Sequence, residues 1–201
     1  MYKELFPKNP NESDVAYDQS LRQATAGNGA LRIAELYSNS FTRSKLDSLL
    51  TDSIQDEKFY PGYLYELLLE LPWAEIHTTN YDTLLERARS KVVDRKYNLI
   101  VDVKDLPHSP KPRIIKLHGS FPSQRPFIIT EEDFRTYPYR FSAFVNTVQQ
   151  SILENCFCLL GFSGDDPNFL QWIGWVRDKF GENAHPIYLC GLFDLSYYEK
   201  S

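Results

Sequence analysis

Three short polar segments hold the side chains whose types and spacing are suited to chemistry, and each follows an apolar run. In the first, Thr79–Asp82, an amide (Asn80) and a carboxylate (Asp82) lie two residues apart, where an alternating run gives way to a helical pattern. Ligands of open α/β sheets bind at the carboxyl ends of strands, so each group can face a sugar hydroxyl or a water. Asn and Asp are also common turn and N-cap residues, and this alternative stays open for the segment taken alone.

The second segment, His118–Ser120, begins where the apolar run Arg113–Leu117 stops. A histidine at a strand end beside a glycine is accessible, and an imidazole suits general-base catalysis because it titrates near neutral pH. For an isolated His-Gly pair, a histidine that only caps a turn is the alternative. The remaining histidines stand within a strand pattern or beside prolines and are weaker candidates: His77, His108 and His185.

The third segment, Gly161–Asn168, follows the most apolar strand candidate of the chain. Its glycines permit tight backbone turns, and Ser163 offers a hydroxyl. Asp166 before Pro167 predicts an N-cap followed by proline at the first helical position. A strand, a Gly/Ser loop and a helix start can form a cradle for the phosphates or ribose of a nucleotide, although a plain strand-to-helix loop is the alternative.

From Trp73 onward, short apolar runs alternate with helical periodicity. The predicted strands are Ala74–Thr79, Tyr97–Val103, Arg113–Leu117, Phe127–Thr130, Cys156–Phe162 and Pro186–Leu192. The predicted helices are Asp82–Lys91, Glu131–Tyr137, Phe141–Glu154 and Pro167–Phe180. Apolar strands separated by helices indicate an α/β fold, with a mostly parallel sheet and helices on both faces.

Residues 1–72 show helical periodicity instead. Ser13 and Asp14 are cap candidates for the first long run. Further predicted helices are Ala30–Ser38, Ser44–Asp52 and Tyr63–Leu71. We therefore expect one domain over residues 1–201, in which an N-terminal helical layer (1–72) covers the sheet-containing part (73–201).

Composition argues against several classes of function. The net charge is −5, and no long Lys/Arg stripe offsets it, so direct nucleic-acid binding is not expected. The most continuous apolar run, Cys156–Phe162, is far shorter than the ~20 residues of a spanning helix, so membrane insertion is not expected. The N-terminus has no secretory signal pattern, which favours a cytoplasmic protein with three core thiols: Cys156, Cys158 and Cys190.

Taken together, the successive segments TTNYD, KLHGS and GFSGDDPN resemble the sirtuin superfamily, and most closely its prokaryotic sirtuin-like branch in antiviral defence proteins. Sirtuins carry a T-x-N-x-D motif, a catalytic histidine in an H-G pair and a G-x-S motif after a later strand. The resemblance covers about Trp73 to Leu192. It implies a Rossmann-like fold with an NAD site.

The resemblance also implies roles for particular residues. Asn80 and Asp82 would contact the nicotinamide ribose and the carboxamide region, Asn80 would also position a water, and His118 would act as general base. The implied catalytic residues are thus His118, Asn80 and Asp82, and the implied NAD-binding residues are Thr79, Asn80, Asp82, Gly161 and Ser163. Breaking the nicotinamide–ribose bond builds an oxocarbenium-like centre, and fixed polar groups with one base suit that reaction.

Two departures from the sirtuin pattern refine these expectations. No Gly-Ala-Gly-x-Ser loop precedes Asn80, which predicts a fragment without the N-terminal Gly-rich loop; a divergent member with a poor or empty cofactor site is the alternative. Protein-deacylating sirtuins carry a four-cysteine zinc module between the H-G pair and the G-x-S motif, but here that interval holds only Cys156 and Cys158. No zinc is therefore expected, as in the sirtuin-like domains of defence systems that hydrolyse NAD.

The resulting hypothesis is an NAD+ hydrolase that releases nicotinamide and ADP-ribose, in bacterial antiphage defence by NAD+ depletion. A homo-oligomer or a larger defence assembly is expected. One alternative is an NAD-dependent protein deacylase or ADP-ribosyltransferase that uses the same site. Another is a non-catalytic nucleotide-binding or assembly module, which the missing phosphate loop would favour.

Overall fold

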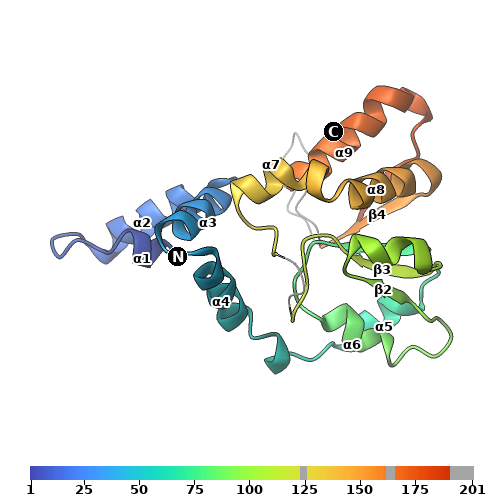
Figure 1. Cartoon of the computed structure of the whole chain (residues 1–201), viewed down its shortest axis with the longest axis horizontal. Helices are drawn as coiled ribbons and strands as arrows, with labels where there is room; N and C mark the ends of the chain where they lie inside the picture. The colour runs from blue at the N-terminus through green and yellow to red at the C-terminus, as the bar shows by residue number, and fades with distance from the viewer. Residues whose placement is uncertain (123–125, 162–165, 191–201) are drawn as a thin grey trace. The chain divides into compact units, whose positions relative to one another are not determined.

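The computed structural model describes residues 1–122, 126–161 and 166–190 (Figure 1). The chain divides into two compact units, Met1–Ser142 and Ala143–Ser201, and each is described here by itself. The single-domain organisation expected from the sequence stays a prediction.

In the first unit the helices are α1 (Tyr2–Leu5), α2 (Asp14–Thr25), α3 (Gly29–Ser40), α4 (Arg43–Ile54), α5 (Tyr63–Glu70), α6 (Leu84–Arg89) and α7 (Glu131–Arg140). Two 3-10 segments are η1 (Asp56–Lys58) and η2 (Val103–His108). The strands are β1 (Glu75–Thr78), β2 (Asn98–Ile100) and β3 (Arg113–Lys116). The second unit holds α8 (Ser142–Glu154, which starts at the last residue of the first unit), β4 (Phe157–Leu160), α9 (Pro167–Phe180), η3 (Gly181–Asn183) and β5 (Ile187–Cys190).

The sheet of the first unit is parallel, with the strand order β1-β3-β2. In register, Thr78 at the end of β1 lies opposite Lys116 at the end of β3. The central strand β3 is the most buried, with Ile114 and Ile115 fully buried. Because the strands run in the same direction, the residues after β1 and after β3 emerge at the same edge of the sheet.

Helices α5 and α6 lie against each other on one face of this sheet (Figure 1). Leu69 from α5 and Ala88 from α6 pack in one buried cluster with Ile114 of β3. Burial of apolar side chains contributes roughly 25 cal/mol per Å², so this cluster fixes α6, which follows the Thr79–Asp82 segment, to the sheet.

The N-terminal helices form their own small core, in which Ala34 and Tyr37 of α3 pack against Leu46 of α4. The predicted cap of the first long helix is confirmed, because the Ser13 side chain accepts a hydrogen bond from the Ala16 amide at the start of α2. Thr42, which the sequence analysis did not name, caps α4 in the same way. The predicted helical character of this part is confirmed.

The second unit places β4 beside β5 in a parallel pair. Helix α9 begins at Pro167, and the Asp166 side chain accepts hydrogen bonds from the Asn168 and Phe169 amides. The predicted N-cap with proline at the first helical position is confirmed, as are the bounds of the α9 prediction.

The α/β class with parallel strands is confirmed, but some predicted elements were wrong. Phe127–Thr130 is not a strand, because it lies in the loop before α7 and its last residue, Thr130, caps that helix. Tyr97–Val103 is shortened to β2, since η2 begins at Val103. The expectation of core thiols was wrong for Cys156 and Cys190, which are exposed, while Cys158 is half-buried.

Candidate functional site

The first two polar segments meet because their strands are neighbours. Beyond the paired residues Thr78 and Lys116, the Leu117 amide still donates to the Thr78 carbonyl at 2.9 Å. Asn80 and His118 therefore each lie two residues beyond the Thr78–Lys116 pair, at the ends of adjacent strands. This is the topological reason why segments almost 40 residues apart in the chain share one edge.

A cavity of about 360 Å³ lies at this edge. Its lining combines four of the predicted site residues with apolar side chains from several helices and loops. The residues that line it are Leu31, Ile54, Thr79, Asn80, Tyr81, Asp82, His118, Ile128, Ile129 and Phe134. The structure thus brings Thr79, Asn80, Asp82 and His118 around one hollow of a size suited to a small-molecule ligand.

The side chains of Asn80 and Asp82 differ in whether they already make hydrogen bonds within the protein. Asn80 is exposed, and its side-chain amide makes no hydrogen bond to the part of the chain that the structure describes, so it can be directed at a ligand. Asp82 uses one carboxylate oxygen to accept from the Leu84 amide at 3.0 Å, at the start of α6. Asp82 therefore acts as a turn residue before α6, which is the alternative that the sequence left open, and it also lines the cavity.

His118 is buried, with 3% of its surface exposed. Its ring lies edge-on to Phe134 and Tyr137 of α7, at centroid distances of 5.2 and 5.5 Å. The Tyr137 hydroxyl donates to the Leu117 carbonyl at 2.9 Å, and the Ile128 amide donates to the His118 carbonyl at 2.9 Å. The imidazole is thus fixed by packing at the cavity wall, where the sequence led us to expect an accessible side chain.

Gly119 is required next to this histidine. Its φ of +107° is a backbone conformation that L side chains rarely adopt, and a Cβ there would lie 3.0 Å from Phe127 Cδ1. The H-G pair is therefore a backbone requirement as well as a chemical motif: the glycine lets the chain turn closely against Phe127 immediately after His118.

Lys116 was missed as a site component by the sequence analysis. It is 1% exposed, its ammonium group lies 3.1 Å from Glu86 Oε1, and it donates a short hydrogen bond to the Asp82 carbonyl oxygen. Ser120 adds a hydrogen bond to the same Glu86 oxygen at 3.4 Å. The signal was present, because a lysine in the run RIIKL places a cation in a buried strand, where charges need partners.

Tyr81 also joins the site. Its hydroxyl donates to the Ile128 carbonyl at 2.7 Å, and its ring packs on Phe127 at 5.0 Å. Its own carbonyl accepts from the Phe121 amide at 3.0 Å. The turn after β1, the chain after His118 and the Phe127–Ile129 wall are thereby bonded to one another.

The third polar segment lies in the second unit. Gly161 has φ +59° and follows β4, as the predicted tight turn requires. Ser163 lies outside the described residues. Burial raises the pKa of Asp166, although the hydrogen bonds from Phe169 and Asn168 oppose the shift. The roles of Gly161 and Ser163 in binding NAD stay predictions.

The described residues form neither a metal-binding cluster nor a membrane-spanning helix. No group of three or more His, Cys, Asp or Glu side chains in ranges 1–122, 126–161 and 166–190 is placed to hold a metal ion. Over the same ranges, every helix is too short or too polar to pass through a membrane.

Comparison with known families identifies the part of the chain that carries these segments. The family model of the SIR2-like domain matches residues 74–198, a range that starts at β1 and includes all three polar segments. The chain belongs to the SIR2-like domain family. The predicted resemblance to the sirtuin superfamily is confirmed, and the match begins after the N-terminal helices.

Several curated relatives share this SIR2-like region. NAD(+) hydrolase ThsA of Acinetobacter baumannii (strain 532279) is 31% identical over 165 residues, which are 78% of this chain and 33% of that protein. ThsA of Bacillus cereus (strain MSX-D12) is 25% identical over 161 residues, 76% of this chain and 33% of that protein. Defense-associated sirtuin 2 of Bacillus subtilis is 24% identical over 192 residues, 92% of this chain and 17% of that protein. The chain thus spans a third or less of the length of these relatives.

Proposed function

We propose that this chain is the NAD+-cleaving domain of a defence NAD+ hydrolase. One observation carries the proposal: Thr79, Asn80, Asp82 and His118 line a single cavity at the carboxyl ends of adjacent parallel strands. The names of the ThsA relatives, which are NAD(+) hydrolases, support the choice of substrate.

The proposed chemistry is hydrolysis of the nicotinamide–ribose bond. A water adds to C1′ of the ribose, the C1′–N bond breaks with its electron pair leaving on nicotinamide, and one proton is released. Asn80 orients the water and Asp82 stabilises the positive charge that develops on the ribose, since fixed polar groups act most strongly where charge develops. His118 serves as the base at the ribose hydroxyls. Gly161 and Ser163 contribute to the ribose and phosphate side of the site.

The apolar half of the cavity lining fits the same proposal. Ile128, Ile129 and Phe134 form a wall beside the polar groups. A wall of this kind suits a flat nicotinamide ring and limits the access of competing nucleophiles, so that one ordered water is the acceptor.

We also propose the setting of the reaction. Because NAD+ is a cytoplasmic metabolite, the chain acts in the cytoplasm, and its activity in defence is controlled within a homo-oligomer or a larger assembly. The name of defense-associated sirtuin 2 supports the defence role. As expected from the sequence, we propose that the 201 residues form one domain.

The test is release of nicotinamide from NAD+ by the purified chain, without any peptide, followed by chromatography. Asn80→Ala should lower kcat by about 100-fold or more, while Asn11→Ala, the same change at an exposed asparagine that does not line the cavity, should leave it unchanged. Turnover that appears only with an acylated peptide would favour the deacylase, and NAD+ binding without turnover would favour the non-catalytic module. Either result would contradict the proposal.

A further inference from the structure

Helix α4 is fastened at both of its ends by charged side chains, and both attachments reach the cavity. At the carboxyl end, Asp56 lies two residues after Ile54, and its side chain is 12% exposed. One carboxylate oxygen accepts from the Thr83 amide at 2.9 Å, and the other accepts from the Thr83 hydroxyl at 2.6 Å. Arg87 of α6 also contacts Asp56, at 3.3 Å.

Thr83 is the residue directly after Asp82, so Asp56 holds the end of the turn that carries Asn80 and Asp82. Both Thr83 donors are used by one carboxylate, which restricts the backbone and the side chain together. Thr83 also supplies the carbonyl that accepts from the Arg87 amide in the first turn of α6. Asp56 therefore fixes the junction between the turn and α6 from outside the sheet.

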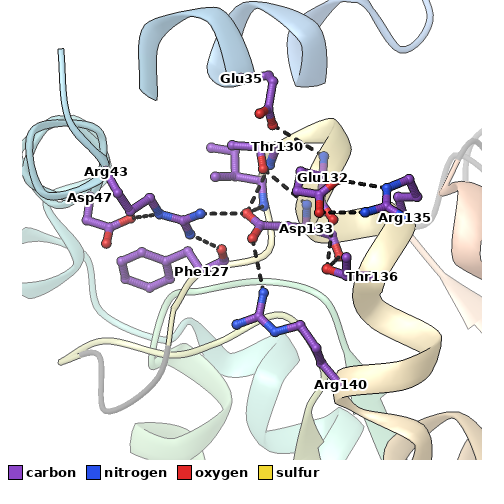
Figure 2. A network of polar contacts seen from close by, with 11 residues as sticks. Glu35, Arg43, Asp47, Phe127, Thr130, Glu132, Asp133, Arg135, Thr136 and Arg140 are labelled. Carbon is purple, nitrogen blue, oxygen red and sulfur yellow. Dashed lines mark hydrogen bonds and ion pairs between the residues drawn. The ribbon is translucent and has the colours of Figure 1, made fainter. Parts of the chain in front are cut away.

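At the other end of α4, Arg43 makes three contacts, which Figure 2 shows. Its guanidinium group bonds to Asp47 at 2.9 Å, to Asp133 at 2.8 Å and to the Phe127 carbonyl oxygen. Burial lowers the pKa of Arg43, but the charge of Asp133 and the hydrogen bonds of both carboxylates outweigh it, so the pKa is raised.

Asp133, in the first turn of α7, is 4% exposed, and it connects Arg43 to the backbone just before that helix (Figure 2). The same oxygen that faces Arg43 accepts from the Ile129 and Thr130 amides, each at 3.2 Å. Ile129 and the preceding Ile128 line the cavity. Arg43 thus holds one wall of the cavity, as Asp56 holds the other.

We propose that α4 is a strut that holds both walls of the cavity in place, one from each end, and that Arg43 at its start and Asp56 just past its last residue are the positioning residues. Helix α4 also places Ile54 in the cavity lining, between these attachments. Both residues precede the matched range 74–198. The N-terminal helical part is therefore a component of the SIR2-like site, because reacting groups must be held within a fraction of an ångström to be effective.

The first test measures kcat and KM for NAD+ cleavage, and this part rests on the proposed function. Asp56→Ala should lower kcat by about 10- to 100-fold with a smaller change in KM, since misplaced groups mainly affect the transition state. Asp56→Asn keeps an acceptor for the Thr83 amide and should recover much of the loss. Glu57→Gln, at the neighbouring exposed acid, is the control. An unchanged kcat in Asp56→Ala would overturn the proposal.

The second test does not need activity and so separates the strut from the hydrolase proposal. Amide hydrogen exchange followed by NMR reports on two hydrogen bonds that neither positioning residue makes: Phe121 amide to Tyr81 carbonyl, and Ile128 amide to His118 carbonyl. Asp56→Ala should speed exchange at Phe121 by about tenfold, and Arg43→Met should do so at Ile128. Arg135→Met removes an exposed ion pair on α7 and is the control.

The outcomes of this second test are decisive whether or not NAD+ is cleaved. The strut is supported if exchange is faster only at Phe121 in Asp56→Ala and only at Ile128 in Arg43→Met. Unchanged exchange at both reporters, or equal acceleration throughout the chain, overturns it. If Asp56→Ala does not fold, the comparison is made with Asp56→Asn, for which a smaller acceleration at Phe121 is the expected result.

Discussion

The ends of β3 and β4 follow the same plan in sequence but differ in what surrounds them. Each strand is followed by a glycine with positive φ, at Gly119 and at Gly161. From the last residue of β3 onward the chain is buried, and Lys116, His118 and Ser120 are each no more than 4% exposed. At the last residue of β4, Leu160 is 46% exposed, and a Cβ on the following Gly161 would meet nothing in the described part of the chain within 4 Å.

Polar residues at the end of a strand do not by themselves make a functional site. At β3, buried charges and aromatic rings hold each polar group in one position. Among the described residues that follow β4, the Asp166 side chain caps α9 and so satisfies a helix start. Preorganisation is therefore observed at the first edge, and preorganised groups are what catalysis needs.

The largest expected effect comes from the buried charges at β3. Lys116→Met should lower the free energy of unfolding by about 3–5 kcal/mol, because it leaves Glu86 charged and half-buried without its cation. Denaturant unfolding followed by circular dichroism measures this. Lys116→Met combined with Glu86→Leu should recover most of the loss, and an equally unstable double variant would contradict the ion-pair explanation.

The two glycines give the next test. Gly119→Ala should cost about 3 kcal/mol, since the strained φ adds about 1–2 kcal/mol and the forced contact with Phe127 adds about 1–3 kcal/mol. Gly161→Ala should cost only about 1 kcal/mol, because its φ of +59° is unfavourable but an added Cβ meets no atom of the described residues within 4 Å. Thermal and denaturant unfolding of both variants check the order. Equal losses would show that the two strand ends are held alike.

A smaller difference is expected within the cavity. His118→Ala removes a ring packed on Phe134 and Tyr137 and should cost about 2 kcal/mol of stability. Asn80→Ala removes an exposed amide and should change stability by less than about 0.5 kcal/mol. Both variants should lose NAD+ cleavage. Melting temperatures measured beside activity separate the two effects, and an unchanged melting temperature for His118→Ala would show that its packing contributes little.

The thiols should matter least. Burial, then the hydrogen bond and charge of Cys190, raise the pKa of Cys158, so its thiol stays protonated at neutral pH. Cys156→Ser, at an exposed position, should change stability by less than about 0.5 kcal/mol and leave activity unchanged. Metal analysis of the purified wild-type chain accompanies this test. A zinc content near one per chain would contradict the expectation of a zinc-free domain.

Local signals carried much of the fold prediction. Ser13, Asp166 and Pro167 marked helix starts because a capping side chain acts within three residues of itself. The run that became β1 was visible from its alternating pattern, and the run that became β3 from the apolar residues Ile114, Ile115 and Leu117. Phe127–Thr130 has equally apolar residues but lies in a loop. Its place is decided by Thr130 and Asp133, which form a capping box for α7.

The sequence alone determined which polar groups follow which strands, and therefore the family and the candidate groups Asn80, Asp82 and His118. Only the tertiary structure decided how those groups are held. Asp56 meets Thr83 across 27 residues, and Arg43 meets Asp133 across 90. Contacts of this kind leave no local pattern, because they depend on where whole helices pack and not on the propensities of neighbouring residues.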